Sequence, residues 1–261
     1  MSIPFANYQP ERQAFDALFQ SECQKRILMF CGESGSGKTS LLEYCLDRIP
    51  KSVTPIPIQL RGSSVSVAEI FHRSGDTMSW NRFPNFTELV GELQGISKVQ
   101  IKSNWLVGKN HISVAMQSES QDVREHRRVA LTDAWFDDLR SFDQPILFAL
   151  DTYEQATPEV QEWISGPFLA RASRSEQVRI LVAGQSVPDK KNIEWGRCCD
   201  ARNLYGVVDA EHWLPVVEAM ERNIPFGEPL TWLSGLCTGL KGRPGEIMKI
   251  IEGLPRKRAT R

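Results

Sequence analysis

The stretch CGESGSGKTS, residues 31–40, decides the fold expected for this chain of 261 residues. It fits the spacing G-x-x-x-x-G-K-[ST] from Gly32 to Thr39, and it directly follows the apolar run RILMF at 26–30. Glycine allows backbone angles that a Cβ atom forbids, so successive N–H groups can converge on phosphate oxygens. A helix that begins after the loop adds the positive end of its dipole. The pattern therefore predicts a strand–loop–helix unit that binds the phosphates of a nucleotide.

Each residue of this loop and of the first helical turn is a candidate phosphate ligand. The candidates are Gly32, Glu33, Ser34, Gly35, Ser36, Gly37, Lys38, Thr39 and Ser40. Lys38 is expected to reach the β- and γ-phosphates and to assist catalysis, and Thr39 to place its hydroxyl on Mg²⁺. The chain has no Asn-Lys-x-Asp motif for reading guanine, and GKNH at 108–111 does not fit that motif. The expected cofactors are therefore ATP or ADP with Mg²⁺.

Two further stretches carry polar residues where an apolar run ends. PILFALDTYEQ at 145–155 places Asp151 at the end of a strand pattern and Glu154 three residues later. Asp151 is the expected metal-associated carboxylate, and Glu154 is a candidate general base that orients the attacking water. Gln185 follows the run VRILVAG at 178–184 and is a candidate contact for the γ-phosphate, with a simple loop residue as the alternative.

Apolar runs alternate with amphipathic stretches along most of the chain, which is typical of a parallel sheet covered by helices. Strands are predicted at 26–31, 54–60, 145–151, 178–184 and 203–208. Helices are predicted at 10–20, 37–48, 65–73, 86–94, 123–142, 157–172, 210–222, 229–238 and 243–252. The prolines within 54–60 favour a place near the sheet edge for that strand. HISVAM at 111–116 has the pattern of an inserted edge strand. We expect an α/β nucleotide-binding domain over 1–208 and a small helical lid over 209–261.

The overall charge and the cysteines limit the classes of function. The net charge is −1 and the isoelectric point is about 6.5, so the whole protein does not attract nucleic acid or an anionic membrane. The one marked basic run is the end of the chain, PRKRATR. Six cysteines occur without a C-x-x-C pair, and no apolar run reaches the length that spans a bilayer. These features predict a cytoplasmic protein with reduced thiols.

The order of these motifs resembles that in AAA+-like ATPases of the STAND type, the nucleotide-gated signalling switches that include NACHT and NB-ARC relatives. The resemblance rests on the phosphate loop, on LFALDTYE, on GLKGRPGEI and on the opening PFANYQPERQAF. It implies a five-stranded parallel sheet followed by a helical lid, whose Gly-x-Pro motif places Pro244 against the nucleotide. Tyr8 and Gln185 stand where many members of the family carry arginine.

The resemblance implies an ATP/ADP-binding switch that couples nucleotide state to lid movement or to assembly, with slow or regulated ATPase activity. A protein partner, or self-association in the ATP state, is expected with it. Two alternatives share the phosphate loop: a DNA-associated AAA+ ATPase, for which only the short basic tail is available, and a metabolic kinase, which would need an acceptor site within 61–144. Arg171 and Arg174 could act as a finger toward a neighbouring subunit, although arginines at a helix end also favour the helix dipole.

Overall fold

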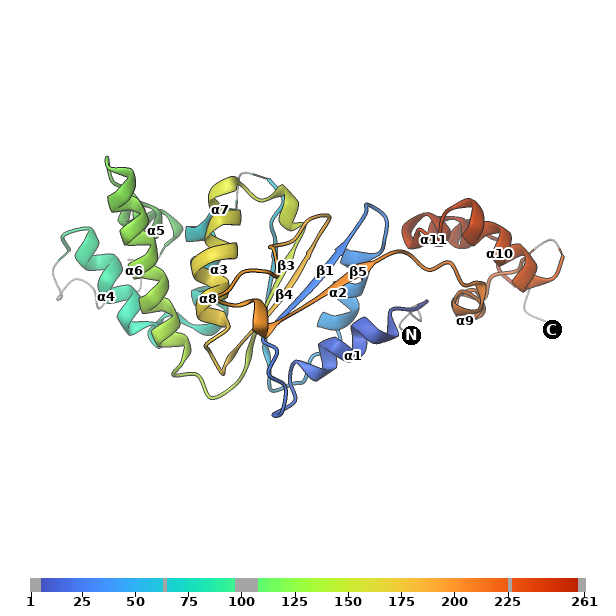
Figure 1. The fold of residues 1–261 in the computed structure, drawn as a ribbon, viewed down its shortest axis with the longest axis horizontal. Coiled ribbons are helices and arrows are strands. Elements are labelled where there is room, and N and C mark those ends of the chain that lie inside the picture. The colour runs from blue at the N-terminus through green and yellow to red at the C-terminus, as the bar shows by residue number, and fades with distance from the viewer. Residues whose placement is uncertain (1–5, 63–64, 97–107, 225–226, 258–261) are drawn as a thin grey trace.

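A single sheet of five parallel strands forms the centre of the molecule (Figure 1). The computed structural model describes residues 6–62, 65–96, 108–224 and 227–257. The strands lie in the order β2-β3-β4-β1-β5. Their bounds are β1 Ile27–Gly32, β2 Thr54–Gln59, β3 Ile146–Asp151, β4 Val178–Gly184 and β5 Cys199–Leu204. The predicted α/β class and five-stranded parallel sheet are confirmed, and the proline-containing strand β2 is at an edge, as expected.

Helices cover both faces of the sheet, because alternate residues of each central strand point to opposite sides. In β1, Ile27 and Met29 belong to one buried core, while Leu28 and Phe30 belong to the other. The first core packs against the helices between β2 and β4, and its centre is a group of aromatic rings around Trp135. The second core joins the sheet to the N-terminal helices and to the C-terminal ones.

The helices follow the predicted pattern with shifts of a few residues at their ends. On the face of the sheet toward which Leu28 and Phe30 point, the helices include α1 Gln9–Ala17, α2 Lys38–Leu46, α9 Leu214–Ala219, α10 Pro229–Gly239 and α11 Pro244–Gly253. Between β2 and β4 the chain forms α3 Val67–Met78, α4 Pro84–Leu93, α5 Lys109–Met116, α6 Gln121–Leu139, α7 Pro158–Trp163 and α8 Leu169–Ala172. Across the described residues, no helix combines the length and apolar character that crossing a membrane requires.

The predicted strand at 203–208 is wrong in its position. Strand β5 occupies Cys199–Leu204 and pairs with β1 from Ile27 to Gly32. As an edge strand it is only partly buried, so it alternates polar and apolar residues and lacks the continuous apolar run that marks an inner strand. The apolar residues at 205–208 belong instead to the segment that follows β5, in which Tyr205 and Val208 are exposed.

The predicted edge strand HISVAM is also wrong, because these residues form most of helix α5. Ile112 and Ala115 are buried three residues apart while Val114 is exposed, which is a helical spacing. The single helix predicted at 157–172 is interrupted by a π-helical segment, Ile164–Phe168, that contains Pro167. Proline removes one backbone donor, so the regular hydrogen-bond pattern of a helix cannot continue through it.

Candidate functional site

The glycine-rich loop connects β1 to α2 at the carboxyl end of the central strand. Gly35 and Gly37 have φ angles of 81° and 86°, in the left-handed region that residues with a Cβ atom rarely adopt. Gly37 is the N-cap of α2, and no side chain caps this end of the helix. The two glycines therefore shape a loop that ends at an uncapped helix N-terminus.

The first backbone N–H groups of α2 are available to a ligand. Within the described part of the chain, the amides of Lys38, Thr39 and Ser40 donate to no protein acceptor, whereas the amide of Leu41 already bonds to the Gly37 carbonyl oxygen at 2.8 Å. Unpaired donors at a helix N-terminus, together with the helix dipole, form a favourable site for a phosphate group.

Lys38 lies across the loop that precedes it. Its ammonium donates to the carbonyl oxygens of Gly32 and Glu33, at 2.7 Å in each case. Partial burial lowers the pKa of Lys38, although the nearby carboxylates of Glu154 and Asp151 act in the opposite direction. The side chain is thus held at the loop by these two carbonyl oxygens, near the carboxylates of Asp151 and Glu154.

Thr39 and Asp151 meet across the gap between α2 and β3. The Thr39 hydroxyl donates to Oδ2 of Asp151 at 3.0 Å, and the second carboxylate oxygen accepts from the backbone N–H of Thr152 at 2.8 Å. Asp151 is only 7% exposed, so its carboxylate is fixed rather than free in solvent. One hydroxyl and one carboxylate fit Mg²⁺, which takes few protein ligands and completes its shell with water and phosphate oxygens.

Glu154 and Gln185 are in direct contact. The backbone N–H of Gln185 donates to the Glu154 carboxylate at 2.8 Å, and its side-chain amide donates to the other oxygen at 3.3 Å. A Cβ atom on Gly184 would lie 2.8 Å from this carboxylate, so a glycine at the end of β4 allows the close approach. The structure therefore places Gln185 as a residue that orients Glu154.

Segments from both ends of the described chain contact the loop. The Tyr8 hydroxyl, which is buried, donates to the Ser36 carbonyl oxygen at 2.6 Å. Pro244, at the start of α11, lies so close to Gly37 that a Cβ atom there would be 3.4 Å from the proline ring. Pro244 is thus beside the glycine-rich loop.

These elements enclose a cavity of about 860 Å³. Of the predicted site residues, Gly32, Glu33 and Ser36 are not among its lining residues, while Ser34, Gly35, Gly37, Lys38, Thr39, Ser40, Asp151, Glu154, Gln185 and Pro244 are. The other lining residues are Ala6, Asn7, Tyr8, Glu43, Tyr44, Asp47, Arg48, Arg61, Thr152, Gln155, Val207, Trp213, Val216, Gly245, Met248 and Glu252. Residues from four strand ends, the N-terminal segment and α11 therefore face one space.

Sequence reasoning missed several of these lining residues. Arg61 directly follows the second predicted strand, and residues that follow parallel strands reach the same end of the sheet, so its position after that strand was an available signal. The guanidinium carbon of Arg48, just past the end of α2, lies 3.6 Å from the centre of the Tyr44 ring, and nothing in the spacing of these two residues distinguishes them from an ordinary protein surface.

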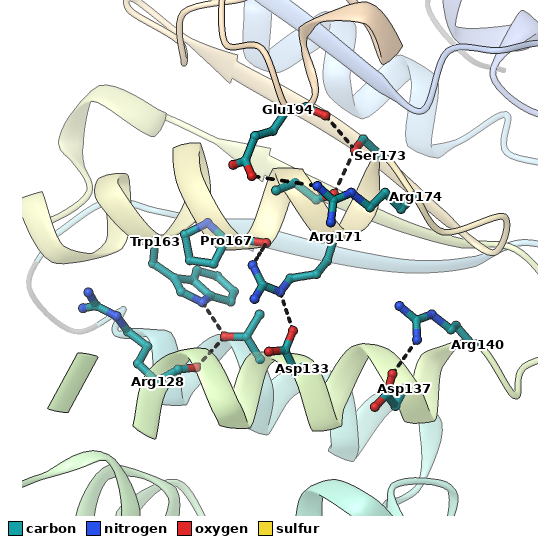
Figure 2. A network of polar contacts seen from close by, with 12 residues as sticks. Arg128, Asp133, Asp137, Arg140, Trp163, Pro167, Arg171, Ser173, Arg174 and Glu194 are labelled. Atoms are coloured by element: carbon teal, nitrogen blue, oxygen red, sulfur yellow. Dashed lines mark hydrogen bonds and ion pairs between the residues drawn. The ribbon is translucent and has the colours of Figure 1, made fainter. Parts of the chain in front are cut away.

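Arg171 and Arg174 lie away from this cavity and make contacts within their own chain (Figure 2). Arg171 donates from Nε to Asp133 of α6 at 2.6 Å and from a terminal nitrogen to the Pro167 carbonyl oxygen. Arg174 is mostly exposed and lies 3.8 Å from Glu194. Figure 2 shows Arg171 reaching from the α7–α8 region toward α6, so this arginine links two helices.

The comparisons with known proteins give no family for this chain: no family model matches it, and a search of curated proteins finds no similar sequence.

Proposed function

We propose that this protein binds ATP or ADP with Mg²⁺ and acts as a nucleotide-dependent switch with slow ATPase activity. The observation that carries the proposal is the meeting of three features at one sheet edge. These features are the unpaired amides at the start of α2, the Lys38 ammonium, and the Thr39 hydroxyl 3.0 Å from the Asp151 carboxylate. They supply the donors, the cation and the metal ligands that a polyphosphate with magnesium requires.

The remainder of the cavity suits a flat base better than a second phosphorylated ligand. Its walls include Tyr8, Val207, Trp213 and Met248, which are aromatic or aliphatic. A pocket with apolar walls and a polar end is the usual form of a small-molecule site. We assign the polar end at α2 to the phosphates and the apolar part to adenine.

Glu154 would act as the base that orients the attacking water. Both of its oxygens already accept hydrogen bonds from Gln185, one from the backbone N–H and one from the side-chain amide. The same bonds fix the direction of the carboxylate, and a fixed direction is what the positioning of a water molecule requires. When bound, Mg²⁺ would neutralise phosphate charge next to Thr39 and Asp151.

The switch follows from the residues that α11 contributes to the cavity. Pro244, Gly245, Met248 and Glu252 line the same space as the phosphate loop, so a nucleotide would contact the sheet and the C-terminal helices together. A ligand shifts a conformational equilibrium only through differential contacts with the two states, and a γ-phosphate with its metal offers such contacts. On this basis, helices α9–α11 act as the lid.

The STAND-type AAA+ assignment and the assembly in the ATP state are part of the same proposal. The five-stranded parallel sheet and the order of the motifs support the assignment. No specific observation favours the kinase, because the described part of 61–144 contributes only Arg61 to the cavity lining. The net charge of −1 likewise gives no support to the DNA-associated alternative.

Calorimetric titration with ATP, ADP and GTP, in the presence and absence of Mg²⁺, tests the proposal. We expect saturable binding of both adenine nucleotides and weaker binding of GTP. Lys38→Ala should abolish binding, and Lys51→Ala, which removes an exposed lysine remote from the cavity, should leave it unchanged. Unchanged affinity in Lys38→Ala would refute the phosphate site. Light scattering with ATP then tests for assembly.

A further inference from the structure

We infer that Arg61 is a second cation of the site, and that it binds the terminal phosphate of ATP. The inference deepens the proposed nucleotide-binding function and depends on it. Arg61 belongs neither to the glycine-rich loop nor to the Gly-x-Pro motif, and it is distinct from the two acidic site residues Asp151 and Glu154.

The strand pairing fixes where Arg61 lies. Strand β2 runs parallel to β3, with Gln59 opposite Asp151, and the backbone N–H of Leu60 donates to the Asp151 carbonyl oxygen at 2.9 Å. Arg61 is the next residue, so it leaves the sheet directly beside the candidate metal carboxylate. Arg61 is one of the residues that line the cavity, together with Lys38 and Glu154.

Arg61 has no side-chain polar contact within the part of the chain that the structure describes. It is exposed, and among the described residues it forms neither an ion pair nor a side-chain hydrogen bond. Two arginines elsewhere in the structure form ion pairs instead, Arg171 with Asp133 and Arg202 with Asp200. A guanidinium group that faces a cavity without a partner retains its full set of donors for a ligand.

The other cations around the cavity leave this role open. Lys38 is held at the loop by two carbonyl oxygens, and Arg48 lies over the Tyr44 ring. Arg243, next to the lining residue Pro244, pairs with Glu246 at 3.1 Å. Gln185 is uncharged. In the described part of the chain, Arg61 is thus the one cavity-lining cation with no such contact.

The position of Arg61 and the chemistry of its guanidinium group both favour the terminal phosphate of ATP as its ligand. The loop and α2 hold the inner phosphates on one side of Asp151, whereas Arg61 lies on the opposite side, at β2. Mg²⁺ held by Thr39 and Asp151 would neutralise phosphate charge on the side of the loop that faces β3 and β2, so a terminal phosphate on that side would come within reach of Arg61. Guanidinium groups bind phosphate oxygens in a bidentate manner, which a lysine cannot reproduce.

The test compares a non-hydrolysable ATP analogue with ADP, each titrated by calorimetry with Mg²⁺ into the wild-type protein and into Arg61→Gln. We expect the variant to bind the analogue roughly ten- to a hundredfold more weakly, as loss of a charge-assisted hydrogen bond implies, while ADP affinity changes by less than about threefold. Arg61→Lys should fall between the two proteins. Because Arg61 is exposed, neither variant removes a buried contact.

Lys51→Gln is the matched control. Lys51 lies before β2 and Arg61 lies after it, so this variant removes one positive charge from the opposite end of the same strand. It should leave the ratio of analogue to ADP affinity unchanged. An Arg61→Gln variant that keeps the wild-type ratio overturns the inference while the nucleotide site stands. A wild-type protein that binds neither nucleotide overturns the proposed function itself, and the two failures are therefore distinct.

Discussion

Replacing Thr39 with valine tests whether the Thr39 hydroxyl is a ligand of Mg²⁺, and it changes the shape of the side chain very little. Valine keeps the branched Cβ atom and removes only the hydroxyl, whose oxygen lies 3.0 Å from Oδ2 of Asp151. The backbone amide of Thr39 remains, so its contribution to phosphate binding is retained. The substitution therefore separates the metal ligand from the phosphate loop.

The structure sets the size of the expected effect on stability. A hydrogen bond to a charged group contributes about 1.5–3 kcal/mol. Asp151 is nearly buried but keeps its bond from the Thr152 amide, and Thr39 is exposed enough for water to replace the lost hydroxyl. We therefore expect the free energy of unfolding to fall by about 1 kcal/mol, below that range, when measured by urea denaturation.

The effect on ligand binding should be larger than the effect on folding. In the wild-type protein, Mg²⁺ should tighten ATP binding, because the metal links the phosphates to Thr39 and Asp151. In Thr39→Val this enhancement should fall by on the order of tenfold, as happens when a group that supports a metal is removed. Binding of ATP without Mg²⁺ should change little.

Calorimetric titration of ATP with Mg²⁺ and with a chelator measures both quantities. Thr77→Val is the control, because Thr77 is an exposed helical threonine on α3 whose hydroxyl donates to the Arg73 carbonyl oxygen and which does not line the cavity. If Thr39→Val retains the full Mg²⁺ enhancement, Thr39 does not hold the metal and the assignment of this half of the site is refuted.

Two further predictions concern the base and the N-terminal segment. Glu154→Gln should retain ATP binding but slow its hydrolysis, measured as phosphate release; an unaltered rate would show that Glu154 is not the base. Burial raises the pKa of Tyr8 to about 12, from 10.0 for a free tyrosine. The native state then holds this proton while the unfolded chain loses it, so the stabilisation is present below pH 10 and lost as the pH rises through about 12. Tyr8→Phe should therefore lose unfolding free energy less steeply over this interval, and equal slopes would contradict the linkage.

Local chemistry allowed much of the fold to be predicted from the sequence. The glycine spacing after an apolar run predicts the loop and the start of α2, because left-handed backbone angles and a helix N-terminus depend on residues near one another in the chain. Inner strands such as β3 and β4 are buried on both faces, so they appear as continuous apolar runs. Asp151 and Glu154 could be identified for the same reason, since they follow such a run.

Edge elements could not be placed in this way. Strand β5 is only partly buried, so it contains charged residues such as Asp200 and Arg202. The apolar residues that follow it led to a predicted strand that begins four residues too late. HISVAM has a residue pattern typical of a strand, yet it forms a helix that packs against α3, α4 and α6. Burial by other elements decided both cases, and propensity alone does not specify it.

The sequence by itself determined the parallel sheet, the glycine-rich loop and the residue types that could hold a phosphate and a metal. Only the tertiary structure decided which of them meet: Thr39 with Asp151, Glu154 with Gln185, Tyr8 with the loop, and Arg61 beside β3. The physical reason is that parallel strands are joined by crossovers, so neighbours in the sheet are distant in the chain. Contacts between such residues depend on strand order, which residue spacing does not encode.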